Sequence, residues 1–163
     1  MTTKRINVER VTVTSSKPLQ DVLSKFDAAI GHPDIKEFWK HVANTRTNPE
    51  MEEVVQSALG SSGFMEFARF DHGRVVHKGE TGNRPEVFRL VIGNPLIMRK
   101  MVKRVPDAGS YAPVTILIDE RPDGVHLSYD RMASFLAPYE NAEVLKVAKD
   151  LDAKVEALLA AVV

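Results

Sequence analysis

Apolar residues near the start of the chain change from one spacing to another, and each spacing predicts an element. β-branched residues crowd positions 8–14, which predicts a first strand. From 19 to 30 the apolar residues recur every three or four positions, which predicts a helix with one apolar face. Ser15, Ser16 and Pro18 lie just before it. We therefore expect a serine hydroxyl to cap this helix, with the proline in its first turn.

Two more amphipathic segments follow before the next strand. The first begins at Pro33, and its apolar stripe includes Trp39. The second begins at Asn48 and Pro49, where we expect the asparagine side chain to be the N-cap, and the glycine-serine run 60–63 ends it. The sequence thus predicts two consecutive helices between the first helix and the second strand.

Extended segments dominate the second part of the chain. Apolar runs predict four further strands, at 64–70, 86–92, 114–119 and 125–129. The last two flank Pro122-Asp123-Gly124, where the glycine can take a positive φ, so they should form a hairpin. In the strand at 86–92 both the odd-numbered and the even-numbered positions carry apolar residues, so both faces of this strand should be largely covered. Helical spacing predicts a short helix over 96–102 and a long one over 141–163.

This order of elements predicts an α+β fold. Hairpins and short links favour an antiparallel sheet of about five strands, and helices gathered on one face of it make a two-layer structure. The long C-terminal helix would supply much of the apolar cover. The sequence contains no internal repeat, linker or low-complexity segment, so we predict a single domain over residues 1–163.

Composition and charge narrow the classes of function. The chain has 163 residues and no cysteine, which excludes disulfides, thiolate metal sites and cysteine nucleophiles. It carries 22 basic and 22 acidic residues, whereas nucleic-acid binders usually have a basic excess. The basic cluster from Arg99 to Arg104 is typical of a solvated helix face. No stretch has the length of a membrane span or a signal-peptide core, so we expect a cytoplasmic protein with no nucleic-acid or membrane partner.

The most evident candidate chemistry is Asp71-His72, at the end of the second predicted strand. A carboxylate beside an imidazole can orient it, or the two can act as separate acid and base, so we name His72 and Asp71 as candidate catalytic residues. The structural alternative is that Asp71 caps the following turn. His77, with His126 or Asp119, could extend the pair to a metal site, but no recognised ligand spacing appears, so we predict no metal and no cofactor.

Three further polar residues are candidates for ligand binding. Arg89 lies in the middle of an apolar strand, so it needs a carboxylate partner, for which Glu66 or Asp119 are the candidates, or it binds an anion. Asn94 precedes Pro95 in a pattern typical of a helix cap, yet its side chain could also line a pocket. Tyr129 combines an apolar ring with a polar hydroxyl and could form a pocket wall.

Several of these segments, in this order, resemble the family named domain of unknown function 302. The matching pieces are the strand ending in Asp71-His72, the strand running into Gly93-Asn94-Pro95, the Ala112-Pro113 pair before the next strand, and the hairpin leading to Ser128-Tyr129. The resemblance implies a curved antiparallel sheet backed by helices, in the broad topology of TATA-binding-protein-like folds, and a homodimer. It implies no reaction, because the family is named for lacking one.

The sequence departs from the family pattern in two places. The family usually has one helix between its first strand and the strand at Phe64, whereas three are predicted here, so 31–60 is interpreted as a helical insertion. After Pro95 the family often has a Gly-Thr pair, and this chain has Leu96 and Ile97 instead.

Three hypotheses for function follow from these observations. The first is a small-molecule-binding domain with a pocket between the sheet and the helices, lined by Asp71, His72, Asn94 and Tyr129. The second is a small enzyme of isomerase, lyase or hydrolase type that uses His72 as general acid or base. The third is an interaction module that dimerises and has no pocket.

Overall fold

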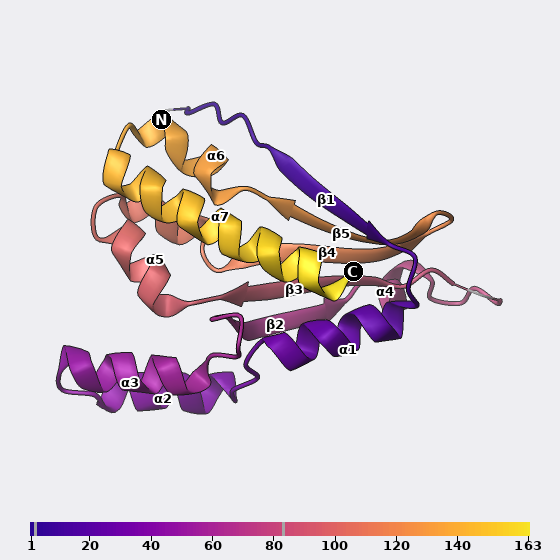
Figure 1. Ribbon diagram of the computed structural model, residues 1–163, viewed down its shortest axis with the longest axis horizontal. Helices are drawn as coiled ribbons and strands as arrows, with labels where there is room; N and C mark the ends of the chain where they lie inside the picture. The colour runs from indigo at the N-terminus through magenta and orange to yellow at the C-terminus, as the bar shows by residue number, and fades with distance from the viewer. Residues whose placement is uncertain (2, 83) are drawn as a thin grey trace.

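The computed structural model describes residues 1, 3–82 and 84–163, and it contains the predicted five-stranded antiparallel sheet. The strand order is β1-β5-β4-β3-β2, and every neighbouring pair is antiparallel. Figure 1 shows the strands fanning out from β2 and β3 to β1, as in a twisted sheet. The strands are β1 (Arg10–Ser15), β2 (Met65–Asp71), β3 (Val87–Gly93), β4 (Val114–Arg121) and β5 (Gly124–Asp130).

The predicted helices are also present, with short additional ones in the connections. The α-helices are α1 (Leu19–Ala29), α2 (Ile35–Asn44), α3 (Asn48–Ala58), α4 (Gly73–Val76), α5 (Pro95–Val102), α6 (Met132–Leu136) and α7 (Ala142–Val162). The described residues also include the 3₁₀ helices η1 (Pro106–Ser110) and η2 (Ala137–Tyr139). These elements confirm the α+β class and the long C-terminal helix.

Two of the predicted helix caps are wrong. Ser15 still belongs to β1, and its hydroxyl accepts from the Lys17 N–H at 3.2 Å. Within the described residues no side chain caps α1. In α3 the cap is Thr47, whose hydroxyl accepts from Glu50 N at 3.3 Å, and Asn48 is already helical. Thr47 and Asn48 are both common N-caps, so local sequence did not decide between them.

Helices cover one face of the sheet. In Figure 1 α7 crosses this face, with α1 lying beside it. The core-facing strand residues and the apolar sides of α1 and α7 form one buried cluster, which includes Phe26, Leu90, Ile116 and Leu151. The opposite face, which we call the open face, carries exposed side chains such as Arg89 and Phe70. The prediction that β3 is covered on both faces is therefore wrong.

A bulge in β2 changes which side chains share a face. The pairing with β3 shifts between Glu66 and Ala68, so Glu66 and Arg69 come to the same face although they are three residues apart. Arg69 Nη2 lies 2.6 Å from Glu66 Oε2, and Arg69 Nη1 donates to Asp27 of α1 at 3.2 Å. The bulge thus ties the edge strand β2 to α1.

The α2–α3 helix pair is connected to the rest of the chain at a junction formed by two glycines. The backbone N–H groups of Gly31 and Gly60 both donate to the carbonyl of Phe64, at 2.9 Å each. A Cβ on Gly31 would overlap the carbonyl oxygen of Ala58, so this junction needs glycine. A second, smaller core of Phe38, Val55 and Met65 packs the pair against β2. Its origin as an insertion over 31–60 stays a prediction.

No helix within the described residues is both long enough and apolar enough to cross a membrane.

Candidate functional site

The Asp71-His72 pair lies at the end of β2, where the carboxylate is used structurally. Asp71 Oδ1 accepts from Arg74 N at 3.0 Å, and Asp71 Oδ2 lies 3.0 Å from Arg74 Nε. The His72 ring stacks on Phe70, with the ring centroids 6.2 Å apart. No hydrogen bond joins Asp71 to His72 within the described part of the chain. Asp71 therefore caps the turn into α4, and the catalytic roles of both residues stay predictions.

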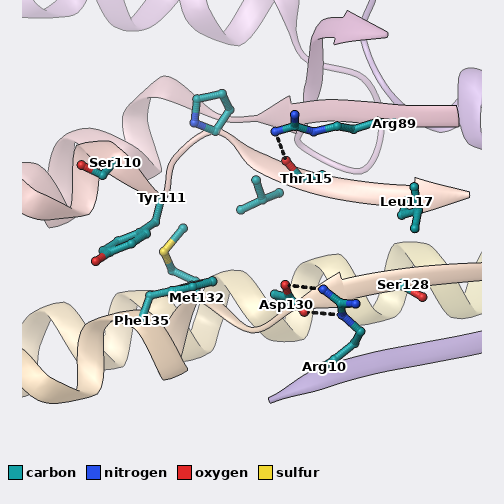
Figure 2. A pocket seen from close by; sticks show the side chains of 12 residues that line it. Arg10, Arg89, Ser110, Tyr111, Thr115, Leu117, Ser128, Asp130, Met132 and Phe135 are labelled. Carbon is teal, nitrogen blue, oxygen red and sulfur yellow. Dashed lines mark hydrogen bonds and ion pairs between the residues drawn. The ribbon is translucent and has the colours of Figure 1, made fainter. Parts of the chain in front are cut away.

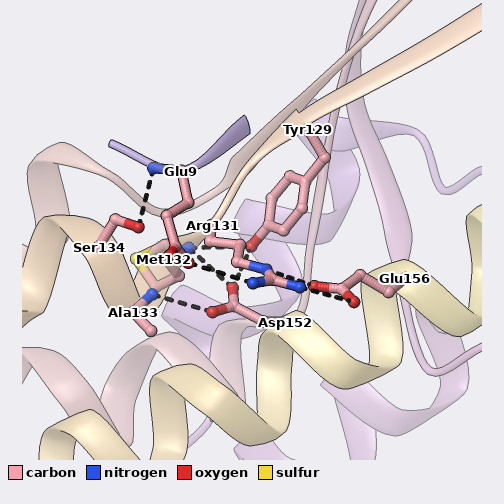
Figure 3. Close-up of polar contacts among 8 residues, drawn as sticks. All are labelled: Glu9, Tyr129, Arg131, Met132, Ala133, Ser134, Asp152 and Glu156. Atoms are coloured by element: carbon pink, nitrogen blue, oxygen red, sulfur yellow. Dashed lines mark hydrogen bonds and ion pairs between the residues drawn. The ribbon is translucent and has the colours of Figure 1, made fainter. Parts of the chain in front are cut away.

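Tyr129 lies in the core, where its hydroxyl belongs to a buried polar network (Figure 3). The hydroxyl donates to Asp152 Oδ1 of α7 at 2.6 Å. The same carboxylate accepts from Met132 N at 2.7 Å and from Ala133 N at 3.0 Å, which are the first backbone donors of α6. Asp152 thus caps α6 from another helix, in place of a local N-cap.

Burial decides the protonation of this network. Burial and the neighbouring Asp152 carboxylate raise the pKa of the Tyr129 phenol far above its ordinary value, so the hydroxyl keeps its proton and remains a donor. Burial also raises the pKa of Asp152, although its hydrogen bonds oppose this shift. Tyr129 is 1% exposed, so its hydroxyl serves packing between β5 and α7.

The structure does not bring the predicted pocket residues together. Asp71 lies on the edge strand β2, where it pairs with Phe88 of β3, whereas Tyr129 lies on β5, where it pairs with Ile116 of β4. Strands β3 and β4 therefore separate the two residues. Buried apolar side chains fill the space between the sheet and helices α1 and α7. The expected common hollow of Asp71, His72, Asn94 and Tyr129 is therefore not formed.

Asn94 does adjoin a cavity, at one end of the sheet. Its Oδ1 accepts from Leu96 N at 2.9 Å, which confirms the predicted cap of α5, and its Nδ2 donates to the Gly63 carbonyl at 3.0 Å. The cavity has a volume of about 250 Å³ and lies between the sheet end, α2, α5, η1 and α7. We call it the apolar cavity; it is lined by Trp39, Phe67, Gly93, Asn94, Pro95, Ile97, Met98, Met101, Val102, Gly109, Ala112, Pro113, Val114 and Leu151.

Arg89 lines a second cavity, on the open face of the sheet (Figure 2). Its Nη2 donates to Thr115 Oγ1 at 3.3 Å, and its guanidinium lies 5.8 Å from the Phe70 ring centre. Neither predicted partner is available, because Glu66 pairs with Arg69 and Asp119 pairs with Arg121. The predicted ion pair of Arg89 is therefore wrong. We call this hollow of about 380 Å³ the open-face cavity.

The profile of the family described as "Domain of unknown function DUF302" matches residues 40–162, which is most of the chain. The chain belongs to the DUF302 family. A search of curated proteins finds no match.

A solved structure supports the same fold for this DUF302 chain. It is the crystal structure of an uncharacterized conserved DUF302 protein from Bacillus stearothermophilus, with 12% sequence identity and a TM-score of 0.64. The similarity covers 94% of this chain and 98% of the other. At 12% identity this similarity shows a shared fold and gives no information on a ligand or a reaction.

Metal-ligating side chains do not gather in this DUF302 structure. Within the described residues, no three His, Asp or Glu side chains are grouped so that they could hold a metal ion. His77 Nδ1 lies 2.7 Å from Glu80 Oε2, and His126 Nε2 lies 2.9 Å from Asp123 Oδ1. The histidines considered for a metal site thus lie apart in the fold, with His72 and His77 at the two ends of α4 and His126 in β5.

The sequence reasoning missed most of the cavity residues and the whole Asp152 network. Trp39 was noted as part of a helical apolar stripe, yet it is 45% exposed and contacts the apolar cavity. An acidic residue on the apolar side of a long helix was the signal that could have drawn attention to Asp152, because buried carboxylates need partners.

Proposed function

We propose that this DUF302 protein binds a compact, largely apolar small molecule in the apolar cavity. The observation that carries the proposal is the cavity lining, which is almost wholly apolar and includes an exposed tryptophan. Ligand sites are typically concave and apolar, with a few polar groups that set orientation. Trp39 packs against Phe38 in a T-shaped arrangement, with ring centroids 5.0 Å apart, and this contact holds the indole in position at the cavity.

The polar groups of the cavity restrict the class of ligand. Both ends of the Asn94 amide are already hydrogen-bonded, to Leu96 N and to the Gly63 carbonyl. Among the described residues, no charged side chain lines this cavity. A sugar or a nucleotide would therefore lose hydrogen bonds to water without replacement, which disfavours both classes.

The size of the cavity restricts the ligand further. Its volume of about 250 Å³ falls below the roughly 300–1,000 Å³ of sites for drug-sized ligands. A molecule of one ring with small substituents matches this space. Such a ligand would contact Trp39, Met98 and Val102, which come from α2 and α5.

Fluorescence titration with iodobenzene tests the proposal, because Trp39 is the only tryptophan of the chain. Iodine quenches a tryptophan that it contacts, so iodobenzene in the cavity should quench the emission and reach saturation. We expect a Kd on the order of 0.1–1 mM for so small a ligand. Gly109→Leu should abolish the saturable part, because Gly109 lines the cavity at a negative φ and has room for a side chain.

Two controls separate binding from simple collision. Iodide ion should quench the half-exposed Trp39 linearly with concentration, and equally in Gly109→Leu. Val75→Leu on α4, where Val75 is 77% exposed, is a matched addition of apolar volume away from the cavity and should bind iodobenzene normally. If Gly109→Leu does not fold, Val102→Phe fills the same cavity. Non-saturable quenching by iodobenzene, unchanged by the filling variant, would exclude the proposal.

The homodimer implied by the family resemblance stays a prediction. Sedimentation equilibrium would measure it directly.

A further inference from the structure

Arg89 has no carboxylate partner in the described part of the chain, although several carboxylates lie near it. Asp130 is held by Arg10 in a bidentate pair, with Nε–Oδ1 at 2.6 Å and Nη2–Oδ2 at 2.8 Å. Asp119 lies 2.6 Å from Arg121 Nε. The guanidinium of Arg89 has five N–H donors, and its only protein acceptor here is Thr115 Oγ1. It therefore keeps donors free for a ligand.

The open-face cavity places this guanidinium beside hydroxyl groups. Arg89 and Thr115 form one side, and Ser128 and the Arg10–Asp130 pair form the other (Figure 2). Ser128 is only 6% exposed, and its hydroxyl lies 3.0 Å from that of Thr12. Polar donors and acceptors thus converge on one part of the cavity.

The other end of the same cavity is flat and apolar. Tyr111 and Phe135 stack with ring centroids 4.7 Å apart and an interplanar angle of 13°. Pro113 and Met132 complete this end. The cavity therefore offers an arginine at one side and aromatic surface at the other, within about 380 Å³.

We propose that the open-face cavity binds a small aromatic carboxylate, with its carboxylate on Arg89 and its ring against Tyr111 and Phe135. The planar guanidinium matches a carboxylate with two parallel hydrogen bonds. Because Asp130 neutralises Arg10, the unpaired charge in the cavity lining is the single positive charge of Arg89, which matches a carboxylate monoanion better than a dianion such as phosphate. This site adjoins the apolar cavity at Pro113 and Val114, which line both, but the proposal does not depend on the function proposed for that cavity.

Titration with benzoate, followed by amide NMR shifts and calorimetry, tests the proposal. We expect saturable shifts at Thr115 and Ser128 and a Kd of about 1 mM or tighter. Arg89→Met should weaken benzoate binding at least tenfold. Arg89→Lys keeps the charge but loses the planar guanidinium, so its affinity for benzoate should lie between that of the parent protein and that of Arg89→Met. Arg74→Met, at a side chain that is 86% exposed on α4, is the matched control and should bind as the parent does.

Other probes identify what the site recognises. Benzamide, which has the shape of benzoate without its charge, should bind at least tenfold more weakly. Phosphate should not displace benzoate. The proposal is overturned if Arg89→Met binds benzoate as the parent does, if benzamide binds equally well, or if benzoate causes no saturable shift up to about 20 mM. If Arg89→Met does not fold, the Arg89→Lys and benzamide results decide. Benzoate should leave iodobenzene quenching of Trp39 unchanged, since Trp39 lines the apolar cavity and not the open-face cavity.

Discussion

On β5, Ser128 and Tyr129 are neighbours in sequence and point to opposite faces of the sheet. The Tyr129 hydroxyl is buried in the core and bonded to Asp152, while the Ser128 hydroxyl has a weaker partner in Thr12 at the floor of the open-face cavity. Arginines show the same contrast. Arg69 on β2 is held by the carboxylates of Asp27 and Glu66, whereas Arg89 on β3 donates a hydrogen bond to a single threonine, Thr115.

The comparison shows where polar groups serve folding and where they remain free. On the core face Tyr129, Asp152 and Arg69 are all hydrogen-bonded, because a buried polar group without a partner would lose water without replacement. On the open face water can replace a missing partner, so an arginine can stay without a carboxylate at little cost. Binding chemistry is therefore to be sought on the open face and at the sheet end, away from the Tyr129 network.

The largest expected effect comes from removing the carboxylate of Asp152. Asp152→Ala removes the acceptor of the Tyr129 hydroxyl and of Ala133 N, and it leaves Met132 N only its longer bond to the Tyr129 hydroxyl oxygen at 3.2 Å. We expect the free energy of unfolding to fall by about 3–5 kcal/mol. Urea denaturation measures this from the midpoint at an unchanged m-value. A loss below about 1 kcal/mol would mean that water satisfies these donors and that the core face is less dry than we infer.

The two arginines provide the next comparison. Arg69→Leu should lower the free energy of unfolding by about 1–2 kcal/mol, because Asp27 and Glu66 lose their partner. Arg89→Leu should change it by no more than about 0.5 kcal/mol. Parallel denaturation curves measure both values. Equal losses would show that Arg89 has a structural role and would remove the contrast between the faces.

The neighbours on β5 sharpen the contrast within one strand. Tyr129→Phe deletes one buried hydroxyl and should cost about 1 kcal/mol, because Asp152 loses a donor. Ser128→Ala should cost about 0.5 kcal/mol or less, since Thr12 can turn to water. Thermal melts at one pH are sufficient for this pair. A larger loss for Ser128→Ala would place a structural network on the open face as well.

The smallest effect is expected at His72. His72→Ala should change the free energy of unfolding by no more than about 0.5 kcal/mol, because its ring only stacks on the exposed Phe70 and lies outside the buried core. The melting temperature measures this. Unfolding by this substitution would assign His72 a structural role and argue against a catalytic one.

Local pattern was sufficient for the elements of this fold. Alternation at 114–119 and 125–129 and the turn glycine predicted β4 and β5, and Gly124 has the expected positive φ of 135°. The cap of α5 by Asn94 was also predicted. These features depend on residues close together in sequence. The bulge in β2 was missed because it follows from pairing with β3, which no local pattern contains.

The candidate site was less predictable than the fold. Glu66 and Asp119 were reasonable partners for Arg89 by charge, but Arg69 and Arg121 lie nearer to them in the folded chain. The apolar cavity draws residues from α2, α5, η1 and α7 as well as the sheet. Such convergence depends on how the layers pack, and the sequence spacing of its residues carries no sign of it.

By itself, the sequence determined the periodicities, and hence the strands, the helices, the α+β class and the resemblance to the DUF302 family. It did so because hydrophobic spacing and turn residues act over a few neighbouring positions. Only the tertiary structure decided that Tyr129 is committed to Asp152, that Arg89 is left without a carboxylate, and that Trp39 stands beside a cavity. Those outcomes depend on contacts between segments far apart in the chain, where each side chain competes for partners with all the others that packing brings near.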